Sequence, residues 1–262
     1  MDFVKLCGAG KDFVLLNNMA GRIPPEAQPD LARRRCDRHF GVGADGLMVV
    51  EPPTQGGDCK MRFYNSDGST AEMCGNGARC ICRYCFETGL SGEVQRIETP
   101  AGLVTGWRQE ADRYRIRLNS PSVIDPDRAG CAYLELGDPG IPHAVLLCDL
   151  TEDRETLRER ARALRFHPAF PRGANVNLCA PAGENALRLL TYERGVEDFT
   201  LACGTGTGAT VAALTLRGLV SGKNTLVHTD GGDLSVDYDP AGNALYLTGP
   251  AKWICEGQIR EA

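Results

Sequence analysis

Short runs of apolar residues recur along the whole chain and predict a protein built mainly of strands. Residues 59–65 (CKMRFYN) and 112–119 (DRYRIRLN) alternate apolar with polar side chains, as half-buried strands do. Residues 45–51, 144–150 and 244–249 are short apolar runs bounded by Gly, Pro, Asn or Asp, which also indicates strands.

Helical patterns are fewer, and three segments carry them. Residues 152–166 (EDRETLRERARALRF) have helical composition and spacing. Residues 76–88 and 206–217 are each followed directly by a glycine, Gly89 and Gly218. A glycine just past the last turn is a common helix end, because it adopts a positive φ without steric cost.

An internal repeat relates the two halves of the chain at an offset of about 130 residues. Cys74-Gly75-x-Gly77 falls on Cys203-Gly204-x-Gly206, and each cysteine lies 47 residues before a proline of a matching motif. Three further motif pairs follow in the same order: GKDFVLL with GIPHAVLL, GAD with GAN, and ETPAGLV with HTDGGDLSV. We therefore expect an α+β fold of two pseudo-symmetric, β-rich halves, residues 1–120 and 121–249, with the tail 250–262 packed back on the first half.

The duplicated cysteines suggest a reaction. Two copies packed about a pseudo-twofold axis would place Cys74 and Cys203 across a cleft, and inversion of a stereocentre needs two acid–base groups on opposite faces of one carbon. Glycines allow close backbone approach, and a helix N-terminus lowers a thiol pKa and binds a carboxylate. Such a site requires no separate cofactor. The alternative is that each motif is a tight turn with a buried thiol.

Three other positions are candidates for the site. Glu193-Arg194, ten residues before the second cysteine, offers an ammonium acceptor beside a carboxylate donor, although an isolated Glu-Arg pair is more often a surface ion pair. Asn65 lies nine residues before the first cysteine, at a nearly equivalent place. His143 is a candidate for tuning a thiol pKa or, equally, a structural histidine.

Charge and length limit the class of partner. The formal net charge is -5 and the pI is near 5.5, which gives no electrostatic reason to bind nucleic acid or an anionic membrane. A small-molecule substrate is the better expectation. The N-terminal segment lacks a basic region followed by a long apolar one, and nowhere do 18 apolar residues run together. We expect a cytoplasmic protein without nucleic-acid or membrane partners.

Twelve cysteines are many for such a chain, yet too dilute for a secreted disulfide scaffold. Most are expected to be buried free thiols. Cys82-x-x-Cys85, together with Cys74 and Cys80, has the spacing of zinc ligands, but one continuous helix would point Cys80 and Cys82 in different directions. We therefore expect no metal site, and a cysteine-rich metal-binding module remains a less favoured alternative.

Several blocks of the chain resemble the diaminopimelate epimerases. YNSDGSTAEMCGNGARC and YERGVEDFTLACGTGTGA are similar to the family's two cysteine blocks, and RHFGVGADGLMVVEP, FPRGANVN and LTGPAKWICEG are also similar, in family order. The resemblance implies a pyridoxal-phosphate-independent isomerase that interconverts LL- and meso-diaminopimelate in lysine and peptidoglycan precursor biosynthesis. On this basis we expect barrel-like antiparallel sheets, each wrapped around a central helix, with the active site in the cleft between the halves, and a homodimer.

The resemblance also implies roles for individual residues. Cys74 and Cys203 are the two catalytic bases, and His143 and Glu193 tune their pKa values. The backbone at Gly75, Asn76, Gly204 and Thr205 binds the reacting carboxylate. Four side chains fall on family positions that hold the distal amino-acid end of the substrate: Asn65, Asn175, Glu193 and Arg194.

Two positions depart from the family pattern. The family usually has Asn in GNDF and GNPH, where this chain has Lys11 and Ile141, and both positions contact substrate in the family. They are equivalent in the repeat, so the paired change indicates either compensation, with Lys11 pairing with a substrate carboxylate, Asp12 or Asp45, or a changed substrate. Proline racemases and hydroxyproline epimerases also pair two cysteines and remain the alternative, although their first motif has His where this chain has Asn76.

Overall fold

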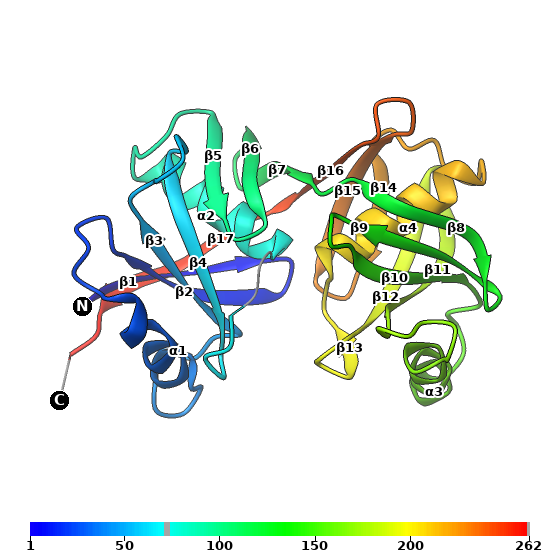
Figure 1. The fold of residues 1–262 in the computed structure, drawn as a ribbon, viewed down its shortest axis with the longest axis horizontal. Helices are drawn as coiled ribbons and strands as arrows, with labels where there is room; N and C mark the ends of the chain where they lie inside the picture. Colours follow the sequence, from blue (N-terminus) through cyan, green and yellow to red (C-terminus); the bar gives the residue numbers. More distant parts are fainter. Residues whose placement is uncertain (71–73, 261–262) are drawn as a thin grey trace. The chain divides into compact units, whose positions relative to one another are not determined.

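The computed structural model describes residues 1–70 and 74–260, which fold into two compact units. Unit 1 comprises residues 1–116 together with the C-terminal segment from Gly249, and unit 2 comprises Arg117–Thr248. The expected boundary at residues 120 and 121 lies within four residues of the observed one. The tail contains strand β17 (Lys252–Gln258), which pairs antiparallel with β1 (Asp2–Gly8) and is thereby part of unit 1 (Figure 1).

Both units are mainly strand, and the fold class expected from the sequence is confirmed. The other strands are β2 (Lys11–Asn17), β3 (Gly46–Glu51), β4 (Cys59–Asn65), β5 (Val94–Thr99), β6 (Gly102–Glu110), β7 (Arg113–Leu118), β8 (Pro121–Arg128), β9 (Cys131–Leu136), β10 (Ile141–Leu147), β11 (Asn175–Gly183), β12 (Ala186–Glu193), β13 (Asp198–Thr200), β14 (Thr225–Thr229), β15 (Gly232–Asp239) and β16 (Ala244–Pro250). The helices are η1 (Pro25–Ala27), α1 (Gln28–Cys36), α2 (Gly75–Glu87), α3 (Arg154–Arg165) and α4 (Gly204–Leu216).

Strand pairing follows the same plan in the two units. In unit 1, β2–β3 and β4–β5 are parallel and the neighbouring pairs are antiparallel. In unit 2, β10–β11 and β12–β14 are parallel, again between antiparallel pairs. The sheets are therefore mixed, whereas the resemblance to the family led us to expect antiparallel sheets. A parallel pair needs a long crossover, which local periodicity does not reveal.

A helix buried on all sides lies inside each unit, α2 in unit 1 and α4 in unit 2 (Figure 1). Ten residues of α4 are buried, nearly all of them Gly, Ala, Thr or Val, because strands surround the helix closely. The hydroxyls of Thr207 and Thr210 donate to the carbonyl oxygens of Cys203 and Gly206, so the buried threonines leave no unpaired donor. Both helices end where the sequence indicates, at Gly89 and Gly218, whose φ angles are +71° and +69°.

Two further helices cover the outside of the sheets. Helix α3 packs Leu157 and Ala161 on β11 and β12, and its N-cap Asp153 accepts hydrogen bonds from the amides of Glu155 and Thr156. Helix α1, which was not predicted, packs on β2 and β3. Its three consecutive arginines make the helical apolar pattern hard to recognise in the sequence, although Leu31, Ala32 and Cys36 are buried.

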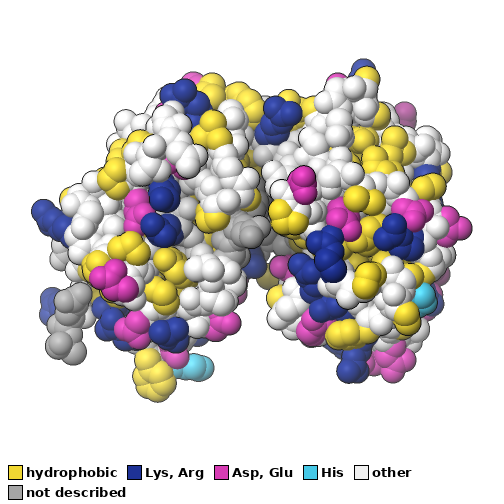
Figure 2. Space-filling view, in the orientation of Figure 1, with side chains coloured by type: hydrophobic (Ala, Val, Ile, Leu, Met, Phe, Trp, Pro, Cys, Tyr) yellow, Lys and Arg dark blue, Asp and Glu magenta, His cyan; other side chains and the backbone are white. Residues whose placement is uncertain are grey.

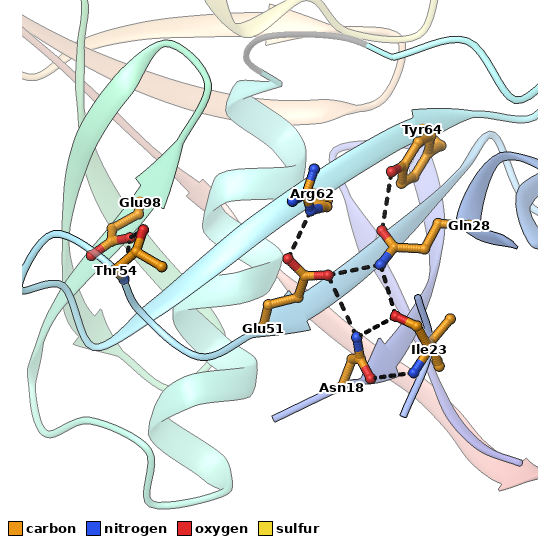
Figure 3. A network of polar contacts seen from close by, with 8 residues as sticks. All are labelled: Asn18, Ile23, Gln28, Glu51, Thr54, Arg62, Tyr64 and Glu98. Carbon is orange, nitrogen blue, oxygen red and sulfur yellow. Dashed lines mark hydrogen bonds and ion pairs between the residues drawn. The ribbon is translucent and has the colours of Figure 1, made fainter. Parts of the chain in front are cut away.

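A buried polar network fixes the start of α1 against the sheet of unit 1 (Figure 3). The carboxylate of Glu51 in β3 accepts hydrogen bonds from Gln28 Nε2 and Arg62 Nε, both at 2.7 Å. The Gln28 side chain in turn accepts from the Tyr64 hydroxyl at 3.0 Å. Burial opposes ionisation of Glu51, but the hydrogen bonds from Arg62 and Gln28 outweigh it and lower the pKa of this carboxyl.

The surface shows no single charged region on the face drawn in Figure 2, where basic and acidic side chains are interspersed over each unit. Within residues 1–70 and 74–260, no helix is long and apolar enough to cross a membrane.

Candidate functional site

Cys74 is the N-cap of helix α2 in unit 1. Its backbone is extended (φ −134°, ψ 109°), and its Sγ accepts a hydrogen bond from the Gly77 amide at 3.4 Å. The side chain is partly exposed. At Gly8 in β1 an added Cβ would lie 2.8 Å from the carbonyl oxygen of Asn76, so only glycine allows this strand to pass the first turn of α2.

Cys203 is the N-cap of helix α4 in unit 2 and has nearly the same geometry. Its backbone is extended (φ −115°, ψ 113°), and its Sγ accepts from the Gly206 amide at 3.4 Å and lies 3.5 Å from Thr205 Oγ1. A thiolate at either cysteine would receive this amide hydrogen bond and the partial positive charge of a helix N-terminus. The structure thus repeats the same N-cap geometry at both cysteines.

The other candidate residues of unit 2 lie on one face of three adjacent strands. His143 pairs in register with Asn175, and Asn177 pairs with Thr191. Since side chains two apart point to the same face, Ile141 and His143 in β10, Asn175 and Asn177 in β11, and Thr191 and Glu193 in β12 share that face. Helix α4 covers it, because an added Cβ at Gly206 would lie 2.3 Å from Asn177 Oδ1.

Asn175 connects two of these elements with the loop after β12. Its Oδ1 accepts a hydrogen bond from the Arg194 amide at 2.8 Å, and its Nδ2 donates to the Pro142 carbonyl oxygen at 3.4 Å. The Arg194 guanidinium donates to the Arg172 carbonyl oxygen at 3.1 Å. Arg172 is paired with Glu135, whereas no carboxylate among the described residues lies within ion-pair distance of Arg194. Arg194 therefore keeps donors for a carboxylate from outside the chain.

His143 is fully buried and neutral at physiological pH. Burial, with a smaller contribution from the Arg194 charge, lowers the pKa of His143 to about 3. Asn177 Nδ2 donates to the carbonyl oxygens of Ala144 (3.1 Å) and Asn175 (3.4 Å), which fixes the orientation of the amide. The same Nδ2 lies 3.3 Å from His143 Nδ1. Nδ1 is then the acceptor, so the proton is on Nε2.

The Nε2–H of His143 is buried and has no hydrogen-bond partner in the part of the chain that the structure describes. A buried donor without a partner is costly, so this N–H is available to an acceptor that the described residues do not supply. The expected effect of His143 on a thiol pKa stays a prediction.

The corresponding face of unit 1 carries Lys11 and Asn65 at its ends. Lys11 begins β2 and lies opposite Gly8, the residue that passes the first turn of α2. Asn65 ends β4, and its Nδ2 donates to Ser69 Oγ at 3.0 Å. Asp12, one of the expected partners of Lys11, binds Lys5 at 3.0 Å and Arg38, and Arg38 also binds Asp45.

The two units differ in the strand side chains that face the first turn of α2 or α4, and the sequence did not predict this difference. In unit 1 the face is apolar. The ring centroids of Phe13 and Phe63 are 5.8 Å apart, and an added Cβ at Gly77 would lie 3.2 Å from Met48 Sδ. The register places His143, Asn177 and Thr191 at the equivalent positions of unit 2. The alternation in NVN at 175–177 was the available sequence signal for Asn177.

No metal cluster is formed by the described residues: no three His, Cys, Asp or Glu side chains lie together in a way that could hold an ion. Cys80, Cys82 and Cys85 are fully buried in α2, and burial raises the pKa of the first two thiols. Cys85 Sγ lies 3.4 Å from Cys59 Sγ, and this contact raises the pKa of the Cys85 thiol.

Comparison with known proteins gives one consistent family. Residues 3–123 and 137–254 match the family model of diaminopimelate epimerase. The diaminopimelate epimerase of Aquifex aeolicus is 37% identical over 278 residues, covering 100% of this chain and 98% of its own. That of Desulfitobacterium hafniense is 39% identical over 287 residues, covering 100% and 99%.

Solved structures with a similar fold are more distant in sequence. The phenazine biosynthesis protein of the PhzF family from Bacillus anthracis has a TM-score of 0.71 at 12% identity, covering 100% of this chain and 99% of its own. A hydroxyproline epimerase from Agrobacterium vitis with bound trans-4-hydroxy-L-proline has a TM-score of 0.67 at 18% identity, covering 98% and 91%. At these identities the likeness concerns the fold alone.

Proposed function

Because the chain belongs to the diaminopimelate epimerase family and is an isomerase, we propose that it interconverts LL- and meso-diaminopimelate with Cys74 and Cys203 as its two acid–base groups. The observation that carries the proposal is the duplicated N-cap geometry, in which each Sγ caps a helix and accepts an amide hydrogen bond at 3.4 Å. The second candidate, a proline or hydroxyproline epimerase, is supported only by relatives of the same fold.

The reaction is a proton exchange at the α-carbon. One cysteine thiolate removes the α-proton and becomes a thiol, while the other cysteine delivers its thiol proton to the opposite face and becomes a thiolate. No redox change or added group is needed. The negative charge that develops at the α-carbon would spread onto the substrate carboxylate. The backbone amides of Gly75, Asn76, Gly204 and Thr205, in the first turns of α2 and α4, would stabilise it.

The distal end of the substrate is a second amino-acid head group. Arg194 and Asn175, which share a hydrogen bond, would bind its carboxylate. Glu193 would accept hydrogen bonds from its ammonium group, because Glu193 ends β12 on the face that α4 covers. Asn65 is the last residue of β4, at the corresponding end of the sheet in unit 1.

The test is α-deuterium incorporation in deuterated water from LL- and meso-diaminopimelate, with proline and hydroxyproline as competing substrates. Cys74→Ala and Cys203→Ala should each abolish isomerisation, whereas Cys148→Ala, a partly exposed thiol of unit 2, should retain it. Activity of the wild type should survive a metal chelator and omission of pyridoxal phosphate. A chelator-sensitive activity, or turnover in either catalytic variant, would contradict the mechanism.

Lys11 and Ile141 decide how far the substrate assignment holds. We expect conversion of diaminopimelate with Lys11 near the substrate carboxylate and Ile141 forming an apolar wall. Changing both to Asn and measuring kcat/KM on diaminopimelate tests this. A rise of about tenfold, as recovery of one or two hydrogen bonds of roughly 1 kcal/mol would give, indicates that the native substrate differs. An unchanged or lower value supports diaminopimelate.

A cytoplasmic homodimer is also part of the proposal. Its support is the resemblance to the family, whose members act in amino-acid biosynthesis. Sedimentation of the purified protein at micromolar concentration should give twice the mass of 28.3 kDa, and a monomer that is fully active would contradict it.

A further inference from the structure

Arg79 is one of the largest completely buried side chains among the described residues. It lies in α2, one turn after Cys74. Its guanidinium donates from Nη2 to Asn76 Oδ1 at 2.9 Å, from Nη1 to the Gly75 carbonyl oxygen at 3.2 Å, and from Nε to the Pro250 carbonyl oxygen at 3.4 Å. Two of its three contacts are thus with the first turn of the helix that Cys74 caps.

No carboxylate of the described residues is paired with this charge. Among the residues that the structure describes, none of the salt bridges includes Arg79, whereas Arg83, one turn later, pairs with Glu87 at 3.5 Å. Burying an unpaired cation is expensive, and burial accordingly lowers the pKa of Arg79. An anion close by would offset that cost.

Three thiols are candidates for that anion. Those of Cys80, Cys74 and Cys82 favour the charged form of Arg79, and the cation of Arg113 opposes it. Burial raises the pKa of the Cys80 and Cys82 thiols far above neutrality, so both stay uncharged. Cys74 is the partly exposed member of the three, and it caps the helix.

The contact with Gly75 also orients a donor. The carbonyl of Gly75 and the amide N–H of Asn76 belong to one peptide unit, which is planar and trans, so the two bonds point in opposite directions. By binding the Gly75 carbonyl from the next turn of α2, the guanidinium helps to keep the Asn76 N–H pointing toward the N-terminal end of the helix. It also polarises the peptide, which strengthens that N–H as a donor.

Unit 2 has no such cation. The internal repeat places Gly208 at the position of Arg79, five residues after the cysteine in each motif. An added Cβ at Gly208 would lie 2.8 Å from Leu118 Cδ1 and 2.9 Å from Leu245 Cδ2. Apolar side chains thus occupy the space that the guanidinium fills in unit 1, and the two thiol environments differ in charge.

We propose that Arg79 is a positioning residue that makes the Cys74 end of the active site the more cationic one, stabilising the Cys74 thiolate and the substrate carboxylate at the first turn of α2. The inference rests on the proposed function for its effect on turnover. It assigns to Arg79 two separable actions, a charge and a fixed orientation of the Asn76 amide.

The experiment measures alkylation of each cysteine by iodoacetamide against pH, read by peptide mass spectrometry, beside kcat and KM for diaminopimelate. Midpoint pH does not depend on how accessible a thiol is, so Cys203 serves as an internal reference. Arg79→Met should raise the Cys74 midpoint by about one unit, which corresponds to about tenfold in thiolate stability, and leave that of Cys203 in place.

Two variants separate charge from structure. Arg79→Lys keeps the charge but not the forked donors, so it should restore the Cys74 midpoint while KM stays several-fold raised. Arg83→Met is the matched control, because Arg83 Nη1 donates to the next carbonyl oxygen of the same segment, that of Ala251, at 2.7 Å. It should leave both midpoints and KM unchanged.

The proposal is overturned if folded Arg79→Met keeps the wild-type Cys74 midpoint and kcat/KM, or if Met and Lys variants are equal in every readout. Should Arg79→Met not fold, Arg79→Lys decides alone: a KM equal to that of the wild type overturns the proposal. A wild type that incorporates no deuterium would refute the proposed function, and the alkylation midpoints would still test the charge of Arg79.

Discussion

Gly77 and Gly206 occupy the same place in the two cysteine motifs, yet alanine should have opposite consequences there. At Gly206 an added Cβ would lie 2.3 Å from Asn177 Oδ1 and 3.2 Å from Thr191 Oγ1. At Gly77 the nearest atom is Met48 Sδ at 3.2 Å. A thioether with several rotatable bonds can yield by a few tenths of an ångström, whereas a buried amide held by hydrogen bonds cannot.

The magnitude follows from the contacts. Gly206→Ala must displace Asn177, which is bound to Thr191 at 3.0 Å and to the Ala144 carbonyl oxygen at 3.1 Å. Loss of these hydrogen bonds costs about 1 kcal/mol each, and overpacking costs about 1–3 kcal/mol more. Higher helix propensity returns at most about 1 kcal/mol. We expect a net loss of about 2–4 kcal/mol for Gly206→Ala and a change within about 1 kcal/mol for Gly77→Ala.

Urea unfolding of both variants measures this difference. The only two tryptophans, Trp107 and Trp253, lie in unit 1, so fluorescence reports that unit, and circular dichroism reports both. Gly206→Ala should lower the urea concentration at the midpoint of the transition seen by circular dichroism. Since 1 kcal/mol corresponds to about 2–4 °C in a domain of this size, its melting temperature should also fall by roughly 4–16 °C. Equal losses in the two variants would show that the polar cluster of unit 2 does not constrain α4.

The remaining predictions concern Asn177 and Asp12. Asn177→Leu should free the His143 tautomer and destabilise the protein by about 2–4 kcal/mol, because the buried partners of Asn177 lose their hydrogen bonds. The ¹⁵N resonances of the imidazole check this, and an unchanged Nε2–H tautomer would contradict it. Burial opposes ionisation of Asp12, but hydrogen bonds from Arg38 and Lys5 lower its pKa to about 2, so its stabilising effect is complete above its unfolded pKa near 4 and is lost as pH falls toward 2. Unfolding free energies of wild type and Asp12→Asn should therefore differ at pH 6 and converge below pH 3, and a constant difference would show that the charge of Asp12 is not responsible.

Local sequence features determined much of this protein. Alternation at 59–65 and glycines at 89 and 218 were enough to place β4, α2 and α4, because strand period and helix ends depend on neighbouring residues alone. The repeat identified the equivalent cysteines of the two halves, each of which is the N-cap of a buried helix. Family resemblance supplied the reaction.

The pairing of distant strands and the environment behind each cysteine were decided by tertiary structure. Parallel pairs such as β4–β5 join segments about thirty residues apart, and no local pattern encodes which strand a segment will meet. The burial of Arg79 could not be read from GNGAR, since an arginine after a glycine-rich turn is usually solvated. The sequence therefore determined which residues are proposed to carry the chemistry. The fold decided the charge and hydrogen bonding around them, because these depend on side chains that different strands bring together.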